Sequence, residues 1–395
     1  MRIAILFDNL GPYHLARLTA TAAAGMTVIA VETRGKSKEY AWDKVESGVA
    51  LDRVTLVPHN EDDPGKREIG RRLTDLLTRR APDVVAIPGW SDHVALAALR
   101  WARSAKVPVI VMSESNRDDG PRVWLREQVK RILLSLCAAG LAGGSRAAAY
   151  LDALGMPPER IATGYDVIDN AYFAAGAAAA RADPGLRQSL GLPDRYFLCC
   201  SRFIAKKNLP LLVDAYARYH VEAAASGALP WGLVIAGDGA ERPAVEARIA
   251  AHDLGEAVKL AGFVQYDGLP GYYGLAGAFV LASTVEQWGL VVNEAMASGL
   301  PVLVSNRCGS AADLVKEGVN GFTFDPGDSG ALAARMREIS EGDGLKMGSE
   351  SARIIADWAP ERFGRAISSL ARMVVERPDD RKSVVALTAL DMLIQ

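Results

Sequence analysis

The chain has 395 residues, 50% of them hydrophobic, so it can bury two ordinary cores, and this length favours two domains. Its 45 Lys and Arg residues nearly balance 47 Asp and Glu residues, and the net charge of −2 argues against a nucleic-acid-binding protein. The cysteines have no zinc-ligand or disulfide-framework spacing, so a reducing, cytoplasmic setting is expected; they are Cys137, Cys199, Cys200 and Cys308.

Short apolar runs alternate with helical patterns in the first half of the chain. The runs at residues 3–7, 27–31, 54–57, 84–87 and 107–111 have the length of strands. This alternation is typical of a doubly wound parallel sheet, whose ligands bind at the carboxyl ends of the strands. The first run is too short for a signal peptide. The apolar stretch at 132–144 is shorter than the roughly 20 residues of a membrane span, and it divides into a helix end and a strand at 139–142.

The loop after the first strand contains a tight turn at Gly11 and Pro12. Tyr13 and His14 follow at the start of a helix, where they would face a ligand at this edge of the sheet. The alternative for His14 is a solvated residue in a first helical turn.

Two further loops of the first half are polar. In the loop after the fourth strand, Ser91 is the expected N-cap of a helix whose first turn holds His93. The helix dipole there would lower the pKa of the His93 imidazole and keep it neutral, although a purely structural histidine is the alternative. The loop after the fifth strand carries Glu114 and Arg117, and it is either an ordinary exposed loop or a ligand-recognition loop.

The segment from Arg122 to Arg131 is predicted to be a helix with several cations next to Trp124. Such a surface can dock on a membrane. Acids at positions 118, 119 and 127 dilute its charge, so a solvated face is the favoured interpretation.

The second half also begins with a strand, at residues 195–200, followed by Arg202 and Lys207. A planar guanidinium fork and a mobile ammonium group suit a diphosphate, and the alternative is a plain basic turn. Gly237 follows the next strand and would let the backbone approach a ligand closely. Val264 lies in the run at 258–265, which is predicted to be a further strand and its end.

The strongest pattern lies between residues 278 and 304. A strand at 278–282 is followed by a turn at Gly289, a helix, a stop at Gly299 and a strand at 302–304. Free N–H groups of residues 289–292 would converge at the helix start, where a phosphate can bind. Glu286 and Glu294 flank this point and could accept hydrogen bonds from hydroxyl groups on either side of the phosphates. A nucleotide sugar fits this arrangement; the alternative is a surface turn with two solvated acids.

The spacing of Glu286 and Glu294, followed by Ala295-Met-Ala-Ser-Gly299-x-Pro301-Val302, resembles the signature of the family 4 retaining glycosyltransferases, also called glycosyltransferase group 1. Asp169 and Phe173 match the segment in which that family crosses between its domains. The resemblance implies an α/β protein of the GT-B type, with two facing Rossmann-like domains and a deep interdomain cleft. Residues 1–170 would bind the acceptor, residues 171–375 the nucleotide sugar, and 376–395 would form a helix packing back on the first domain.

The resemblance also implies roles for the residues named above. The catalytic set comprises Glu286, His93, Arg202 and Lys207. The donor and its phosphates would be bound by Arg202, Lys207, Gly237, Val264, Gly289, Leu290, Val291 and Glu294. The acceptor side would include Gly11, His14, Glu114 and Arg117.

The expected reaction transfers a hexosyl unit from a nucleoside diphosphate sugar, a UDP-sugar in the first instance, to an acceptor hydroxyl with retention. Neither a metal nor a cofactor is expected besides the donor. A small-molecule or saccharide acceptor is favoured over a lipid. The alternatives are a nucleotide-sugar epimerase or a phosphorylase of similar fold, and a non-catalytic nucleotide-sugar-binding protein. The donor base and sugar, the acceptor and the oligomeric state stay open.

Overall fold

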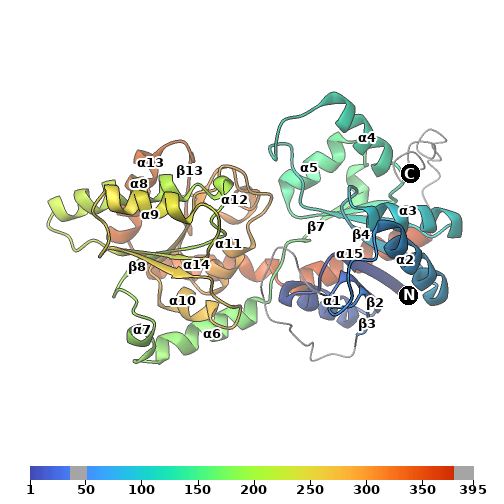
Figure 1. Cartoon of the computed structure of the whole chain (residues 1–395), viewed down its shortest axis with the longest axis horizontal. Coiled ribbons are helices and arrows are strands. Elements are labelled where there is room, and N and C mark those ends of the chain that lie inside the picture. Colours follow the sequence, from blue (N-terminus) through green and yellow to red (C-terminus); the bar gives the residue numbers. More distant parts are fainter. Residues whose placement is uncertain (36–50, 378–395) are drawn as a thin grey trace. The chain divides into compact units, whose positions relative to one another are not determined.

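The computed structural model describes residues 1–35 and 51–377, and their contacts divide the chain into two units. The first unit contains Met1–Ile168 together with Ala359–Gln395, and the second contains Asp169–Trp358 (Figure 1). Each unit has its own sheet, and every strand pairing in both sheets is parallel. The predicted class of two doubly wound α/β domains is therefore confirmed.

The sheet of the first unit has the strand order β3-β2-β1-β4-β5-β6-β7. Its central strands are apolar and almost fully buried, as expected for a sheet covered on both faces. The short strand β7 was not predicted, because three half-buried residues carry too little pattern. The strands are β1 (Arg2–Phe7), β2 (Thr27–Arg34), β3 (Asp52–Val57), β4 (Val84–Pro88), β5 (Val109–Ser113), β6 (Ala139–Ala142) and β7 (Ile161–Thr163).

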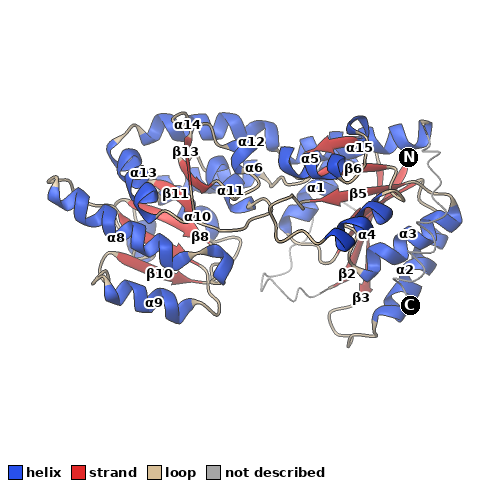
Figure 2. Ribbon diagram, turned by 90° about the horizontal axis from the view of Figure 1, so that it is seen from above, coloured by secondary structure: helices blue, strands red, loops and turns tan. Residues whose placement is uncertain are grey.

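Helices cover both faces of this sheet (Figure 2). One face packs against α2, α3, α4 and α5 through a single apolar cluster, while α1 and α15 pack together in the other helical layer. The helices are α1 (Pro12–Ala23), α2 (Lys66–Arg80), α3 (His93–Ala105), α4 (Trp124–Leu134), α5 (Ser145–Ala153) and α15 (Pro360–Glu376), with a 3₁₀ turn at Pro158–Arg160.

The sheet of the second unit has the order β10-β9-β8-β11-β12-β13. Its strands are β8 (Tyr196–Cys200), β9 (Gly232–Ala236), β10 (Val258–Gly262), β11 (Ala278–Leu281), β12 (Val302–Ser305) and β13 (Gly321–Phe324). One helical layer contains α8 (Leu209–Ala225), α9 (Arg242–Ala251) and α13 (Ser329–Glu341). The other contains α6 (Asn170–Ala182), α10 (Leu269–Leu275), α11 (Leu290–Ala297) and α14 (Gly344–Ile355). Two short helices, α7 (Leu186–Ser189) and α12 (Ala311–Leu314), and the 3₁₀ turns Ala205–Lys207 and Ala356–Trp358 complete the unit.

The strand order reverses once in each sheet, between β1 and β4 in the first unit and between β8 and β11 in the second. Loops leave such neighbouring strands in opposite directions, so a crevice opens at their carboxyl ends where ligands bind. In the first unit His14 and His93 lie in the first turns of the helices that follow these two strands. In the second unit the corresponding loops carry Arg202, Lys207 and Glu286.

Helix α15 belongs to the first unit, whereas residues up to 375 were predicted to lie in the second domain. It packs on α1 so closely that a Cβ at Gly364 would lie 2.4 Å from the Ala20 carbonyl oxygen. The amphipathic pattern of α15 defines an apolar face, but it does not say which sheet that face covers. Of the predicted terminal helix at 376–395, residues 378–395 lie outside the described part of the chain.

Candidate active site

An ion pair joins the loops that follow β8 and β11. The ammonium group of Lys207 contacts Oε2 of Glu286, and the hydroxyl of Ser283 donates to the same oxygen at 3.3 Å. The Lys207 side chain is 11% exposed and that of Glu286 is 12% exposed, so the pair is largely shielded from solvent. The sheet topology thus brings together two predicted site residues that lie 79 positions apart in the chain.

The loop after β12 holds the Glu286 loop in place. The N–H of Gly309 donates to the Glu286 carbonyl at 2.9 Å, and the N–H of Ser310 donates to the Trp288 carbonyl at 3.2 Å. A Cβ at position 309 would lie 1.7 Å from the Gln287 carbonyl oxygen, so glycine is required there. The backbone around Glu286 is therefore held independently of its side chain.

Helix α11 presents unpaired amides next to the ion pair. Gly289 is its N-cap residue, with φ of 92°, a conformation that favours glycine. In the described part of the chain, the N–H groups of Gly289, Leu290 and Val291 have no hydrogen-bond partner. The N–H of Val292 already donates to the Gly289 carbonyl at 2.9 Å, so the predicted set of free amides at 289–292 is shorter by one residue. These donors at a helix start can receive phosphate oxygens.

Glu294 lies on the same helix but is 1% exposed. Its Oε2 accepts a hydrogen bond of 2.7 Å from the hydroxyl of Tyr273, a residue of α10. Tyr273 was not predicted, because one tyrosine in an apolar helix gives no signal of a polar contact. Glu294 is therefore anchored in the protein interior and is not the solvated acid of the alternative interpretation.

The other predicted donor-side residues lie along the same edge of the sheet. Arg202 is half-buried in the loop after β8, and Val264 is half-buried in the loop after β10. Gly237 follows β9 with φ of 138°, and a Cβ there would lie 1.8 Å from the Ser201 carbonyl oxygen. The backbone at Gly237 thus closely approaches the β8 loop, and its approach to a ligand stays a prediction.

His14 caps its own helix in the first unit. Its Nδ1 accepts a hydrogen bond of 3.2 Å from the N–H of Gly11, and its ring packs against Phe7 with centroids 4.3 Å apart. Burial, with a smaller contribution from the charge of Arg17, lowers the pKa of His14 to about 3. His14 is therefore a neutral, half-buried residue and not the solvated one of the alternative interpretation. Tyr13, which was expected to face a ligand, is 7% exposed.

His93 is the first residue of α3, as predicted, but Asp92 and not Ser91 is the N-cap. The Asp92 carboxylate accepts from the N–H of Val94 at 3.3 Å and also lies 2.6 Å from Nδ1 of His93. Ser91 was preferred because serine and aspartate are equally good caps and spacing does not separate them. Since Asp92 favours a proton on Nδ1, the Nε2 atom of a neutral His93 is an acceptor, and it has no partner among the described residues.

Glu114 and Arg117 differ in their surroundings, since Glu114 is half-buried and Arg117 is exposed. Glu114 is half-buried and interacts with Asp166, which is fully buried beside Arg17 at 3.5 Å. Burial, and next the charge of Glu114, raise the pKa of Asp166 well above its usual value, which favours its protonated form. Arg117 lies exposed in the following turn. Asp166 and Arg17 were not predicted, because neither residue follows a strand in a recognisable motif.

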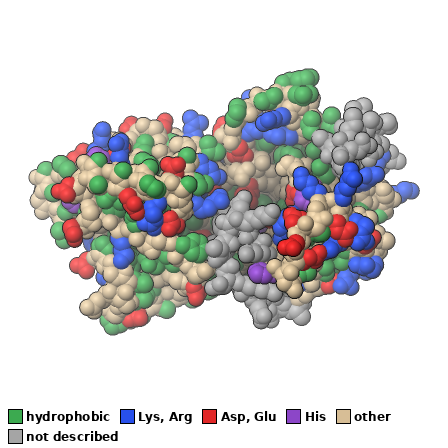
Figure 3. All heavy atoms as spheres, viewed as in Figure 1, with side chains coloured by type: hydrophobic (Ala, Val, Ile, Leu, Met, Phe, Trp, Pro, Cys, Tyr) green, Lys and Arg blue, Asp and Glu red, His purple; other side chains and the backbone are tan. Residues whose placement is uncertain are grey.

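The surface at the start of α4 is more apolar than expected. Val123, Trp124 and Leu125 are exposed by 47%, 73% and 64%, and Figure 3 shows apolar and basic side chains gathered at the top of this unit, where α4 lies. Lys130 donates to Glu127 and to the Tyr150 hydroxyl, both at 2.8 Å, so its charge is locally balanced. In the portion of the chain that the structure covers, no helix is both long and apolar enough to span a bilayer.

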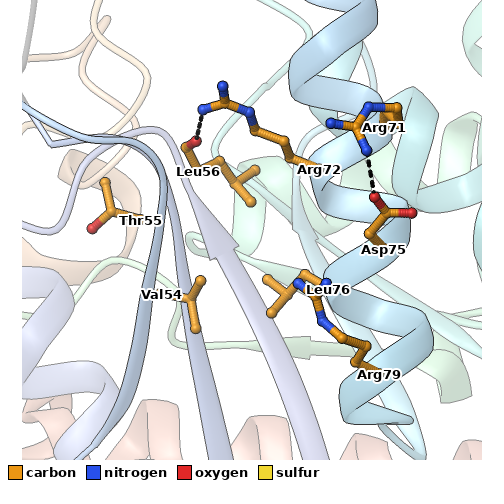
Figure 4. Close-up of a pocket in the computed structure, with 8 residues that line it drawn as sticks. All are labelled: Val54, Thr55, Leu56, Arg71, Arg72, Asp75, Leu76 and Arg79. Atoms are coloured by element: carbon orange, nitrogen blue, oxygen red, sulfur yellow. Dashed lines mark hydrogen bonds and ion pairs between the residues drawn. The ribbon is translucent and has the colours of Figure 1, made fainter. Parts of the chain in front are cut away.

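A hollow of about 310 Å³ lies between β3 and α2 of the first unit (Figure 4). Two of the arginines that line it already have partners. Arg71 pairs with Asp75, and Arg72 donates to the Leu56 carbonyl and pairs with Glu61. No predicted site residue lines it. The hollow is therefore not the candidate active site.

Two family models match the chain, one in each unit. The model described as "Glycosyl transferase 4-like domain" matches residues 12–164, and the one described as "Glycosyl transferases group 1" matches residues 185–356. The second match includes the Lys207–Glu286 pair and the free amides of α11.

Curated relatives match part of the chain. An alpha-D-kanosaminyltransferase of Streptomyces kanamyceticus is 31% identical over 175 residues, which cover 43% of this chain and 42% of the relative. A 2-deoxystreptamine N-acetyl-D-glucosaminyltransferase of Niallia circulans is 31% identical over 122 residues, covering 31% of this chain and 30% of that protein. The matched segments thus span less than half the length of these relatives.

Solved structures match nearly the whole chain. Anabaena Alr3699/HepE in complex with UDP superposes with a TM-score of 0.70 at 17% identity, covering 93% of this chain and 99% of that one. Sucrose-phosphate synthase from Thermosynechococcus elongatus gives a TM-score of 0.72 at 18% identity, with coverages of 95% and 99%. At these identities the likeness concerns the fold. Together with the two family models, it shows that the chain belongs to the group 1 glycosyltransferases, the family 4 proteins of GT-B type.

Proposed function

We propose that the protein is a retaining hexosyltransferase whose second unit binds a nucleoside diphosphate sugar and whose first unit binds a hydroxyl acceptor. The observation that carries this proposal is the meeting of Lys207, Glu286 and the free amides of Gly289 to Val291 at one switch point. Cations and unpaired amides at such a point suit a diphosphate.

The ion pair is compatible with phosphate binding. A lysine ammonium group has three N–H donors, and Glu286 occupies one of them through Oε2. The others can reach phosphate oxygens while Glu286 keeps the ammonium group in position. Arg202, which like Lys207 follows β8, adds a second cation to this edge of the sheet.

In the proposed reaction the acceptor hydroxyl attacks the anomeric carbon on the face from which the diphosphate leaves. The bond from this carbon to the phosphate oxygen breaks, a bond to the acceptor oxygen forms, and the departing phosphate takes the acceptor proton. Negative charge develops on the diphosphate, and Arg202, Lys207 and the amides of α11 stabilise it. These fixed positive groups provide the charge stabilisation that a bound metal ion provides in other enzymes, so the proposed reaction needs no metal.

A UDP-sugar is the proposed donor. This choice is supported by the solved neighbours of the same fold that hold UDP or UDP-glucose. Glu294 would accept hydrogen bonds from the ribose hydroxyls, and the backbone near Val264 would meet the base.

The proposed acceptor is a small polyhydroxylated molecule or a saccharide. Its side of the site would be the polar edge of the first unit, with His93, Glu114 and His14. Nε2 of His93 can accept a hydrogen bond from a sugar hydroxyl. The name of one relative, a 2-deoxystreptamine N-acetyl-D-glucosaminyltransferase, supports an acceptor of this size. Each of the four cysteines is a buried thiol, which supports a reducing setting such as the cytoplasm.

Thermal unfolding with a panel of nucleoside diphosphates and nucleotide sugars tests the proposal. A ligand at one hundred times its Kd should stabilise the fold by about 2.7 kcal/mol. Lys207→Ala should abolish the shift, whereas Lys206→Ala, which removes the adjacent cation outside the ion pair, should keep it. A panel in which no nucleotide shifts the unfolding of the wild type would remove the proposal.

A further inference from the structure

The hydroxyl of Tyr273 reaches the acid that is proposed to bind ribose. Tyr273 lies on α10 and is fully buried, and its hydroxyl donates to Oε2 of Glu294 at 2.7 Å. Its ring stands edge-on to Phe173, with centroids 5.9 Å apart, and is tilted against Phe279 at the same distance. The aromatic contacts hold the ring, so the position of the hydroxyl is set by packing.

In this hydrogen bond the Tyr273 phenol is the donor and the Glu294 carboxylate is the acceptor. Burial first, and then the neighbouring Cys200 and Glu294, raise the pKa of the Tyr273 phenol well above its usual value. The phenol thus remains protonated and acts as the donor. Burial likewise raises the pKa of the Cys200 thiol, so this thiol is protonated and adds no negative charge near Glu294. A neutral donor beside a 1% exposed carboxyl group replaces part of the water that burial removes.

The position of Glu294 on α11 indicates how the hydrogen bond from Tyr273 can orient the carboxylate. Glu294 follows Leu290 by four residues, so the two share one face of the helix, and Leu290 contributes one of the free amides. The terminal torsion of a glutamate side chain is broad and is not fixed by the backbone. A hydrogen bond to one carboxylate oxygen restricts it.

We propose that Tyr273 is a positioning residue, whose hydroxyl holds the Glu294 carboxylate in the orientation that accepts hydrogen bonds from the ribose hydroxyls of a nucleoside diphosphate. The inference rests on the proposed function, in which Glu294 meets the ribose. It adds a residue of α10 to the donor site and gives a role to the almost fully buried carboxyl group of Glu294.

Tyr273→Phe tests the inference, because it removes one oxygen atom and keeps the ring packing. The matched control is Tyr216→Phe on α8. It removes an equally buried hydroxyl, which donates to the Trp231 carbonyl at 2.8 Å. Calorimetric titration with UDP and with 2′,3′-dideoxy-UDP separates ribose contacts from phosphate contacts. Thermal unfolding of both variants is measured first, and both should melt a few degrees below the wild type.

Tyr273→Phe should weaken UDP binding about fivefold to tenfold and leave 2′,3′-dideoxy-UDP binding unchanged, since one oriented hydrogen bond is lost. Tyr216→Phe should leave the affinity for both nucleotides unchanged. In a Glu294→Gln background, the same Tyr273→Phe change should have no further effect on UDP binding, and this double-mutant comparison does not depend on the stability of the single variant.

The outcomes distinguish the inference from the proposed function. Equal losses for both nucleotides, or full retention of UDP affinity in Tyr273→Phe, would overturn the positioning role alone. A wild type that binds UDP and 2′,3′-dideoxy-UDP equally well would remove the ribose role of Glu294 and the inference with it. A wild type that binds neither nucleotide would overturn the proposed UDP-sugar donor and, together with it, the positioning role.

Discussion

Replacing Lys207 by methionine should separate the structural role of the ion pair from its proposed role in catalysis. Methionine keeps most of the side-chain volume but leaves Glu286 without its cation, at 12% exposure. Breaking a buried pair costs about 3–5 kcal/mol. Because the Ser283 hydroxyl still donates to Glu286 and some solvent reaches it, we expect a cost below this range, about 2–3 kcal/mol. Such a loss corresponds to a fall in Tm of about 5–10 °C for a unit of this size.

The double variant Lys207→Met/Glu286→Gln should recover most of that stability, because no largely buried charge is left unpaired. It should not recover activity. Loss of one group that stabilises the charge on the leaving diphosphate should lower kcat by about 10²–10³-fold, or about 2.7–4 kcal/mol. The assay couples release of the nucleoside diphosphate to a spectrophotometric signal, with unfolding followed by circular dichroism. Lys206→Met is the control and should change neither quantity much.

Recovery of activity together with stability in the double variant would refute the reasoning. It would mean that the pair serves only to hold two loops together. An unchanged Tm in Lys207→Met would instead refute the prediction that the ion pair stabilises the fold.

Two further predictions concern the first unit. His14 should make stability rise with pH between about 3 and 6.5, because burial lowers its pKa to about 3 and the unfolded chain binds the extra proton in that range. The half-buried imidazole should contribute about 1 kcal/mol between pH 6.5 and pH 5, and urea unfolding of His14→Gln should lack this contribution while that of His59→Gln, at an exposed site, keeps it. Gly364→Ala should lower the Tm by several degrees, because the new Cβ would lie 2.4 Å from the Ala20 carbonyl oxygen; Gly120→Ala, which meets open space, should not.

The local elements of this protein follow from short-range patterns in the chain. Apolar runs of four to eight residues predicted β1 to β6 and most strands of the second unit, since burial on both faces of a parallel sheet leaves a continuous apolar run. The turn at Gly289, the stop at Gly299 and the carboxyl-end loops were also predicted, because backbone conformation there depends on a few neighbouring residues.

Contacts between distant segments could not be obtained in this way. The sequence placed Lys207 and Glu286 in one unit, but only the strand order joins them as an ion pair. The bond between Tyr273 and Glu294 depends on how α10 and α11 pack, and no local pattern records it. The same holds for α15, whose apolar face suits either sheet.

The sequence by itself therefore determined the two α/β domains, the order of their elements and the chemical character of the site. Neighbouring residues specify secondary structure and loop chemistry. The tertiary structure decided which unit α15 completes, which amides of α11 stay unpaired, and which acids are anchored and by what. These features depend on packing and on hydrogen bonds between residues far apart in the chain, which no pattern of neighbouring residues specifies.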